Sequence, residues 1–295
     1  MSEKINELPK SSDKMNPEDF FKLSDLLKKQ IWLEDVFEAL IELWNLCEYK
    51  DEQKLMYQLL LNFLCLDSRK INNYCKDISI HVCEEWGIDS ESTKIVALCN
   101  EERPDGSQFL IQSLKNKFAN RNNWTEKNFA NNLASIGKAA YQLENGQNLI
   151  LIDDFIGTGN TVERKIKWLK SKIKEKNRCD IKIFLVSLAY MQDALNVIKS
   201  LKIKFFSPIK LKKGISDCYD GEILKNNIHN MKNLESKLNP IYKNWRLSNY
   251  NFGYGKTESL FAIEGLNVPN NVFPIFWWPL LIEERERKTI LKRIR

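Results

Sequence analysis

The sequence contains little histidine and no paired cysteine motif. Its 295 residues include only two histidines, His81 and His229, so a histidine-based zinc site or a Ser-His-Asp triad has almost nothing to be built from. The seven cysteines are scattered and none forms a Cys-x-x-Cys pair. An odd number of dispersed cysteines argues against a disulfide framework. We therefore expect reduced thiols and a cytoplasmic protein.

Long apolar runs are also missing. No stretch reaches the ~18 residues of a membrane span, and the first residues are polar, without the apolar core of a signal peptide. We therefore expect no contact with a membrane. The net charge of +6 and the isoelectric point near 8.8 favour anionic ligands in general, such as sugar phosphates, RNA or DNA. That isoelectric point lies below the value above ~9 that is typical of a dedicated nucleic-acid domain.

The hydrophobic pattern changes once along the chain. Helical spacing dominates from residue 16 to about residue 86, where we expect four or five helices and no strand. Beyond residue 92, apolar β-prone runs at 93–99, 149–152, 181–188 and 203–206 alternate with helical patterns at 107–118, 133–143, 160–173 and 194–201. This alternation predicts an α/β fold with a parallel sheet flanked by helices. We expect an N-terminal all-α domain over 1–88 and the α/β domain, with the C-terminal segment, over 89–295.

Residues 149–161 carry the clearest functional pattern. An apolar strand ends in Asp153 and Asp154, and after a short turn Thr158-Gly159-Asn160-Thr161 opens a helix. Ligands of open parallel sheets bind beyond the carboxyl ends of the strands. There the carboxylates can accept hydrogen bonds from sugar hydroxyls, while the glycines and the start of the helix can hold a phosphate on backbone N–H groups. The pattern predicts a site for a phosphorylated sugar; the alternative is an acidic strand end that caps the next helix.

This segment resembles the phosphoribosyl-pyrophosphate (PRPP) motif of type I phosphoribosyltransferases. The resemblance implies that Asp153 and Asp154 are the catalytic and metal-side residues, which meet the ribose 2′- and 3′-hydroxyls, with Asp154 nearer the reacting ribose and Mg²⁺ as cofactor. It implies that the following residues wrap the 5′-phosphate: Phe155, Ile156, Gly157, Thr158, Gly159, Asn160 and Thr161. Two positions depart from the commonest pattern, because Phe155 replaces a smaller aliphatic residue and Gly157 stands where some members carry an acid.

Two loops of that family are harder to place. The positional candidate for the pyrophosphate loop is Arg103–Ser107, in which Gly106 and Ser107 could supply backbone donors. The alternative is an ordinary strand-to-helix turn with Ser107 as the helix cap. The mobile catalytic loop normally follows a strand ahead of the motif. Residues 126–146 look mostly helical here, so the sequence does not identify that loop.

The C-terminal segment narrows the resemblance. Gly253-Tyr254-Gly255-Lys256, Val268-Pro269-Asn270-Asn271 and Ile275-Phe276-Trp277-Trp278-Pro279 are similar to a divergent branch of phosphoribosyltransferase-like proteins. That branch occurs in bacterial conflict and anti-phage systems, including some retrons. Its implied partners are a winged-helix protein and a reverse transcriptase with its RNA or DNA product, and its implied role is that of a defence effector.

These observations lead to an expected activity and two rivals. We expect attack at the anomeric carbon of PRPP or a nucleotide, with pyrophosphate or a base as leaving group, as in a glycosyltransferase or a nucleotide N-glycosidase. One rival is a PRPP- or nucleotide-sensing regulator without turnover. The other is a protein that docks a nucleic acid or a partner. The aromatic residues 276–278 could stack on a base, but we expect them to pack on the core.

Overall fold

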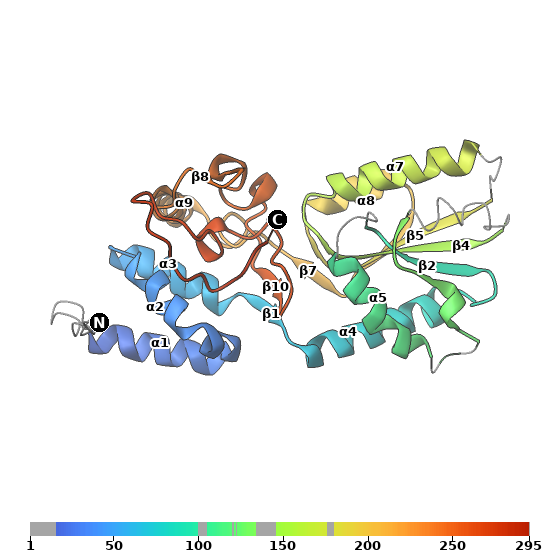
Figure 1. Ribbon diagram of the computed structural model, residues 1–295, viewed down its shortest axis with the longest axis horizontal. Coiled ribbons are helices and arrows are strands. Elements are labelled where there is room, and N and C mark those ends of the chain that lie inside the picture. The colour runs from blue at the N-terminus through green and yellow to red at the C-terminus, as the bar shows by residue number, and fades with distance from the viewer. Residues whose placement is uncertain are drawn as a thin grey trace, which may run out of the picture.

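The computed structural model describes residues 16–99, 105–119, 121, 123–133, 146–175 and 180–294. These residues form two lobes that lie side by side (Figure 1), one built on a parallel sheet and one built from helices and the C-terminal segment. The helix expected over 133–143 lies outside the described residues from residue 134 on, and Arg103 and Pro104 lie outside them as well. No helix in the described ranges combines the length and the apolar character that a bilayer crossing requires.

The sheet confirms the predicted α/β class. Its strands run in the order β3-β2-β4-β5-β6, all parallel, and β7 continues beside the end of β5. The strands are β2 (Thr93–Ala97), β3 (Phe129–Ala130), β4 (Asn148–Ile156), β5 (Lys182–Met191), β6 (Lys204–Phe206) and β7 (Ile209–Leu211). Because β4 pairs with β2 on one side and β5 on the other, the acidic end of β4 lies at the centre of the sheet.

Helices cover both faces of the sheet. Figure 1 shows α7 (Asn160–Glu175) and α8 (Ala194–Ser200) on one side, and α4 (Ser68–Ile80) and α5 (Gly106–Phe118) on the other. The apolar positions of α7 that share one helical face are all buried, as the 3.6-residue spacing predicts: Val162, Ile166, Leu169 and Ile173. The covered faces explain why the central strands are almost wholly apolar.

The second lobe joins the beginning of the chain to its end. It contains α1 (Pro17–Lys29), α2 (Phe37–Asn45), α3 (Lys50–Leu61), α9 (Gly221–Ser236) and the hairpin β8 (Ile241–Tyr242)–β9 (Trp245–Arg246). Leucines of α1–α3 share one hydrophobic cluster with the aromatic residues 276–278. Those three aromatic side chains are at most 2% exposed, so their expected packing on the core is confirmed.

The expectation of no strand before residue 86 is wrong. Strand β1 (Leu64–Leu66) pairs in parallel with β10 (Phe261–Ile263). A three-residue strand forms here because its partner arrives from a distant part of the chain, which local periodicity cannot show. The hydrophobic clusters divide the chain elsewhere than at the expected boundary of residue 88. Helix α4 packs on the sheet, whereas α1–α3 pack on the C-terminal segment.

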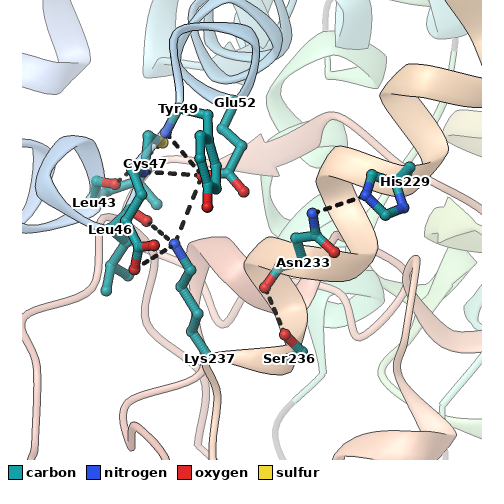
Figure 2. A network of polar contacts seen from close by, with 10 residues as sticks. Leu43, Leu46, Cys47, Tyr49, Glu52, His229, Asn233, Ser236 and Lys237 are labelled. Carbon is teal, nitrogen blue, oxygen red and sulfur yellow. Dashed lines mark hydrogen bonds and ion pairs between the residues drawn. The ribbon is translucent and has the colours of Figure 1, made fainter.

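A polar network ties the two ends of this lobe together (Figure 2). Lys237, directly after α9, donates to the carbonyl oxygen of Leu46 at 2.6 Å and forms ion pairs with Glu48 at 3.1 Å and Glu52 at 3.6 Å. Glu52 is 1% exposed, and its carboxylate also accepts the backbone N–H of Glu48 at 2.9 Å. Lys237 therefore compensates a buried charge at the start of α3.

Candidate functional site

Three carboxylates meet at the carboxyl end of the sheet. Asp153 and Asp154 belong to the last part of β4, and Asp105 is the N-cap residue of α5, which follows β2. One oxygen from each of the three lies within 4.8 Å of the others. The sequence predicted the pair but not the third member. The sequence feature that could have identified Asp105 is an acidic helix cap that follows the strand next to β4. Neighbouring parallel strands end at the same edge of the sheet, so such a residue lies near the end of β4.

The electrostatics of this cluster favour a bound cation. Burial raises the pKa of Asp153 well above its usual value, and the carboxylates of Asp154 and Asp105 raise it further. Burial and then Asp105 raise the pKa of Asp154 to about 7. Lys165 on α7 opposes the rise at Asp153, and its Nζ donates to the carbonyl oxygen of Leu98. Clustered carboxylate oxygens are the ligands that Mg²⁺ takes, so the residues present fit that ion.

The start of α5 lies directly against the acidic pair. A β-carbon on Gly106 would lie 2.1 Å from Oδ2 of Asp154, so only glycine allows this approach. The side chain of Asp105 accepts the backbone N–H of Ser107 at 3.2 Å, which makes Asp105 the cap. The alternative expectation that Ser107 caps the helix is wrong, and its side chain is fully buried in the helix. Of the two expected loop residues, Gly106 lies against Asp154.

The turn from Gly157 to Thr161 connects β4 to α7. Gly159 has φ +83°, and a β-carbon there would lie 3.1 Å from Cβ of Val197, so α8 closes one side of the turn. Asn160 and Thr161 are exposed at the first turn of α7, and Thr158 is half-buried. The first N–H groups of a helix lack intrahelical partners, so this end of α7 can hold an anion.

Two of the expected ligand residues contribute their side chains to the core instead. The ring of Phe155 stacks on Phe261 of β10, with centroids 5.1 Å apart. Ile156 is buried in the cluster between the sheet and α7. These positions therefore offer a ligand only their backbone groups.

The segment ahead of the motif begins differently from the expected helix. Glu126–Asn128 form a single 3₁₀ turn, and β3 then pairs with β2. The amide of Asn128 fixes this segment, because its Nδ2 donates to the carbonyl oxygens of Ser90 at 2.6 Å and Thr93 at 3.0 Å. The expectation of a mostly helical segment is wrong at Glu126–Ala130, and residues 134–145 lie outside the described part of the chain.

A sequence model of the family described as PRTase-CE matches residues 32–293, which include the sheet and most of the second lobe. The chain belongs to the PRTase-CE family. The match spans the acidic cluster, the Gly157–Thr161 turn and the C-terminal segment, so all three lie within the PRTase-CE unit. No curated protein matches the chain.

Several solved structures are similar at low identity. A hypothetical protein from Neisseria gonorrhoeae with bound ppGpp is 10% identical, with a TM-score of 0.34 over 50% of this chain and 83% of that chain. Hypoxanthine-guanine phosphoribosyltransferase from Schistosoma mansoni in complex with IMP is 16% identical, with a TM-score of 0.33 over 50% and 68%. Orotate phosphoribosyltransferase from Mycobacterium tuberculosis H37Rv in complex with PRPP is 10% identical, with a TM-score of 0.29 over 55% and 90%. The membership in PRTase-CE rests on the family match.

Proposed function

We propose that this chain binds PRPP or a nucleotide together with Mg²⁺ and transfers or cleaves at the ribose anomeric carbon. One observation carries the proposal: three clustered carboxylates lie at the strand end from which an open helix start follows. The carboxylates suit a diol and a divalent cation, and the helix start suits a phosphate. A sugar phosphate presents these groups together.

Each part of the site has a role in this proposal. Asp154 and Asp153 accept hydrogen bonds from the ribose hydroxyls, and the Gly157–Thr161 turn holds the 5′-phosphate. Asp153 and Asp105 would hold Mg²⁺, which when bound supplies positive charge for a pyrophosphate leaving group. Gly106 brings the start of α5 against Asp154, and the positive end of the helix dipole favours negative charge there.

The chemistry follows from positioning more than from a dedicated base. Breaking the bond from C1′ to the leaving group gives a cation-like sugar, which the neighbouring carboxylates stabilise. Both histidines are occupied elsewhere, since His81 stacks on Phe206 at 3.6 Å and His229 contacts Asn233 on the surface of α9. Burial and then Asp105 raise the pKa of Asp154 to about 7, so in this proposal its carboxyl group can take a proton near neutral pH.

We extend the proposal to a role as an anti-phage effector in a cytoplasmic, retron-type system. The support is the C-terminal motif of the divergent branch, whose residues lie against the Gly157–Thr161 turn. In that role the candidate partners remain a winged-helix protein and a reverse transcriptase with its RNA or DNA product.

The test measures pyrophosphate release from Mg-PRPP and base release from nucleotides. The wild type is compared with the double variant Asp153→Asn/Asp154→Asn, and Asp89→Asn, at the opposite end of the sheet, is the control. We expect release by the wild type and the control only. Protection from heat by PRPP without release would favour the sensing regulator. Equal release by all three proteins would contradict the proposal.

A further inference from the structure

The loop from Phe252 to Glu258 has an unusual backbone. Five of its seven residues have positive φ, and three of these five are not glycine; the five are Phe252 (59°), Gly253 (77°), Gly255 (70°), Lys256 (52°) and Glu258 (50°). Each non-glycine residue in this conformation is sterically strained, because its β-carbon crowds the backbone. Such a loop persists only when its surroundings fix it, and such strain collects at functional sites.

Buried polar groups fix the loop at both ends. At its start, the carboxylate of Glu235 accepts the backbone N–H of Phe252 at 3.0 Å. At its end, the buried carboxylate of Glu258 accepts the backbone N–H groups of Ile215 at 2.9 Å and Ser216 at 2.8 Å. The loop is therefore a rigid part of the second lobe.

The middle of the loop lies on the proposed phosphate turn. A β-carbon on Gly255 would lie 2.4 Å from Cγ2 of Thr158. Asn271 bridges the same two segments: its side chain lies against Gly157, and its Nδ2 donates to the carbonyl oxygen of Tyr254 at 3.0 Å. A rigid, strained loop of one lobe is thus held against the ligand-facing turn of the other.

We infer that Lys256 binds the 5′-phosphate of the ligand held by the Gly157–Thr161 turn. Lys256 directly follows Gly255, is exposed, and within the described ranges has no carboxylate at ion-pair distance. The cation named at the acidic cluster, Lys165, already donates to Leu98. A phosphate beside Thr158 therefore gains a cation from this loop. The inference rests on the proposed function and adds to it a binding residue from the second lobe.

The experiment measures the affinity of Mg-PRPP, ribose 5-phosphate and pyrophosphate by calorimetry. The variants are Lys256→Ala and Lys256→Arg, and the control is Lys243→Ala. Lys243 is also an exposed lysine of the same lobe with φ +53°, so the backbone cost of the substitution is matched. We expect Lys256→Ala to weaken PRPP and ribose 5-phosphate about tenfold, with pyrophosphate unchanged. Lys256→Arg should retain most of the affinity, and melting temperatures should not move.

The outcomes separate the two proposals. Unchanged affinity of Lys256→Ala for PRPP, in a protein that binds it, would overturn the inference and leave the proposed function standing. Weakening of pyrophosphate alone would overturn the assignment to the 5′-phosphate. A wild type that binds none of the three probes would overturn the proposed function and this inference with it.

Discussion

The side-chain amide of Asn271 occupies the space where a side chain on Gly157 would begin. A β-carbon on Gly157 would lie 2.3 Å from Nδ2 of Asn271, which is closer than any real contact. Nδ2 of Asn271 donates to the carbonyl oxygen of Tyr254 at 3.0 Å, and the backbone oxygen of Asn271 accepts the hydroxyl of Thr257 at 2.8 Å, so the amide is held in this position. The glycine at a position where some phosphoribosyltransferases carry an acid therefore has a structural cause in this chain: the second lobe fills that space.

We predict that Gly157→Ala lowers the free energy of unfolding by about 1–3 kcal/mol, because the added methyl group overpacks the contact with Asn271. The double variant with Asn271→Ala should lose less than the sum of the two single variants. Urea unfolding of the four proteins in a double-mutant cycle measures this coupling. Gly157 is not among the glycines with positive φ, so the loss reports the contact and not a left-handed backbone. Strictly additive losses would contradict the contact.

We predict that Asp153→Asn raises the melting temperature of the ligand-free protein at pH 7.5 while abolishing Mg-PRPP binding. The raised pKa of Asp153 means that folding disfavours its charged form, so stability is lost as pH rises through the folded-state pKa. Asparagine avoids that loss. Asp89→Asn should instead lower the melting temperature, because the backbone N–H of Ser92 lowers the pKa of Asp89 and so stabilises its charge. A lower melting temperature for Asp153→Asn would indicate a structural carboxylate.

Glu235 should make stability depend on pH. Burial raises the pKa of this carboxyl from 4.5 to about 8, so its stabilising contribution is complete at low pH and is lost as pH rises toward 8. Glutamine keeps an acceptor for the N–H of Phe252 and does not titrate. The stability of Glu235→Gln relative to the wild type should therefore increase between pH 5.5 and pH 8.5. Denaturant unfolding at a series of pH values checks this, and a difference that stays constant with pH would refute it.

Removal of Lys237 should destabilise the fold, because the buried carboxylate of Glu52 loses its ion-pair partner. We expect Lys237→Met to lower the free energy of unfolding by about 1–3 kcal/mol, because Glu52 stays buried without its cation (Figure 2). Lys225→Met on α9 removes the pair with Glu222, whose side chains are about three-quarters exposed, and it should change stability by less than about 1 kcal/mol. Urea unfolding distinguishes the two. Equal effects would mean that the Lys237 pair is worth no more than a surface contact.

Four strands of the sheet, β2, β4, β5 and β6, could be predicted because their information is local, whereas β3 and β7 were not predicted. Apolar runs of strand length alternate with helices whose apolar positions share a face, and the acidic pair marks the end of the central strand. The strand was expected to stop at Ile152, yet β4 continues to Ile156. The reason is that Phe155 and Ile156 find core partners on both faces, and only the structure shows those partners.

The second lobe could not be predicted because its contacts connect distant residues. The pairing of Leu64 with Phe261 leaves no local pattern, and each strand of the pair has only three residues. The same limit applied to the site. Asp105 joined the acidic cluster through sheet register, and Gly255 reached Thr158 through a loop with left-handed backbone. The motif predicts which residues bind, and the tertiary fold shows which residues surround them.

The second lobe is built from two separate stretches of the chain, and the lobe that contains the sheet lies between them in the sequence. The first stretch of the second lobe ends at β1. The sheet and its helices follow, and after β7 the chain forms the rest of the second lobe with α9 and the C-terminal residues. A fragment that begins at α4 would therefore lack helices α1–α3, which pack in one hydrophobic cluster with Trp277 and Trp278. A partner that binds the second lobe would reach the proposed phosphate turn through two contacts, Asn271 with Gly157 and Gly255 with Thr158.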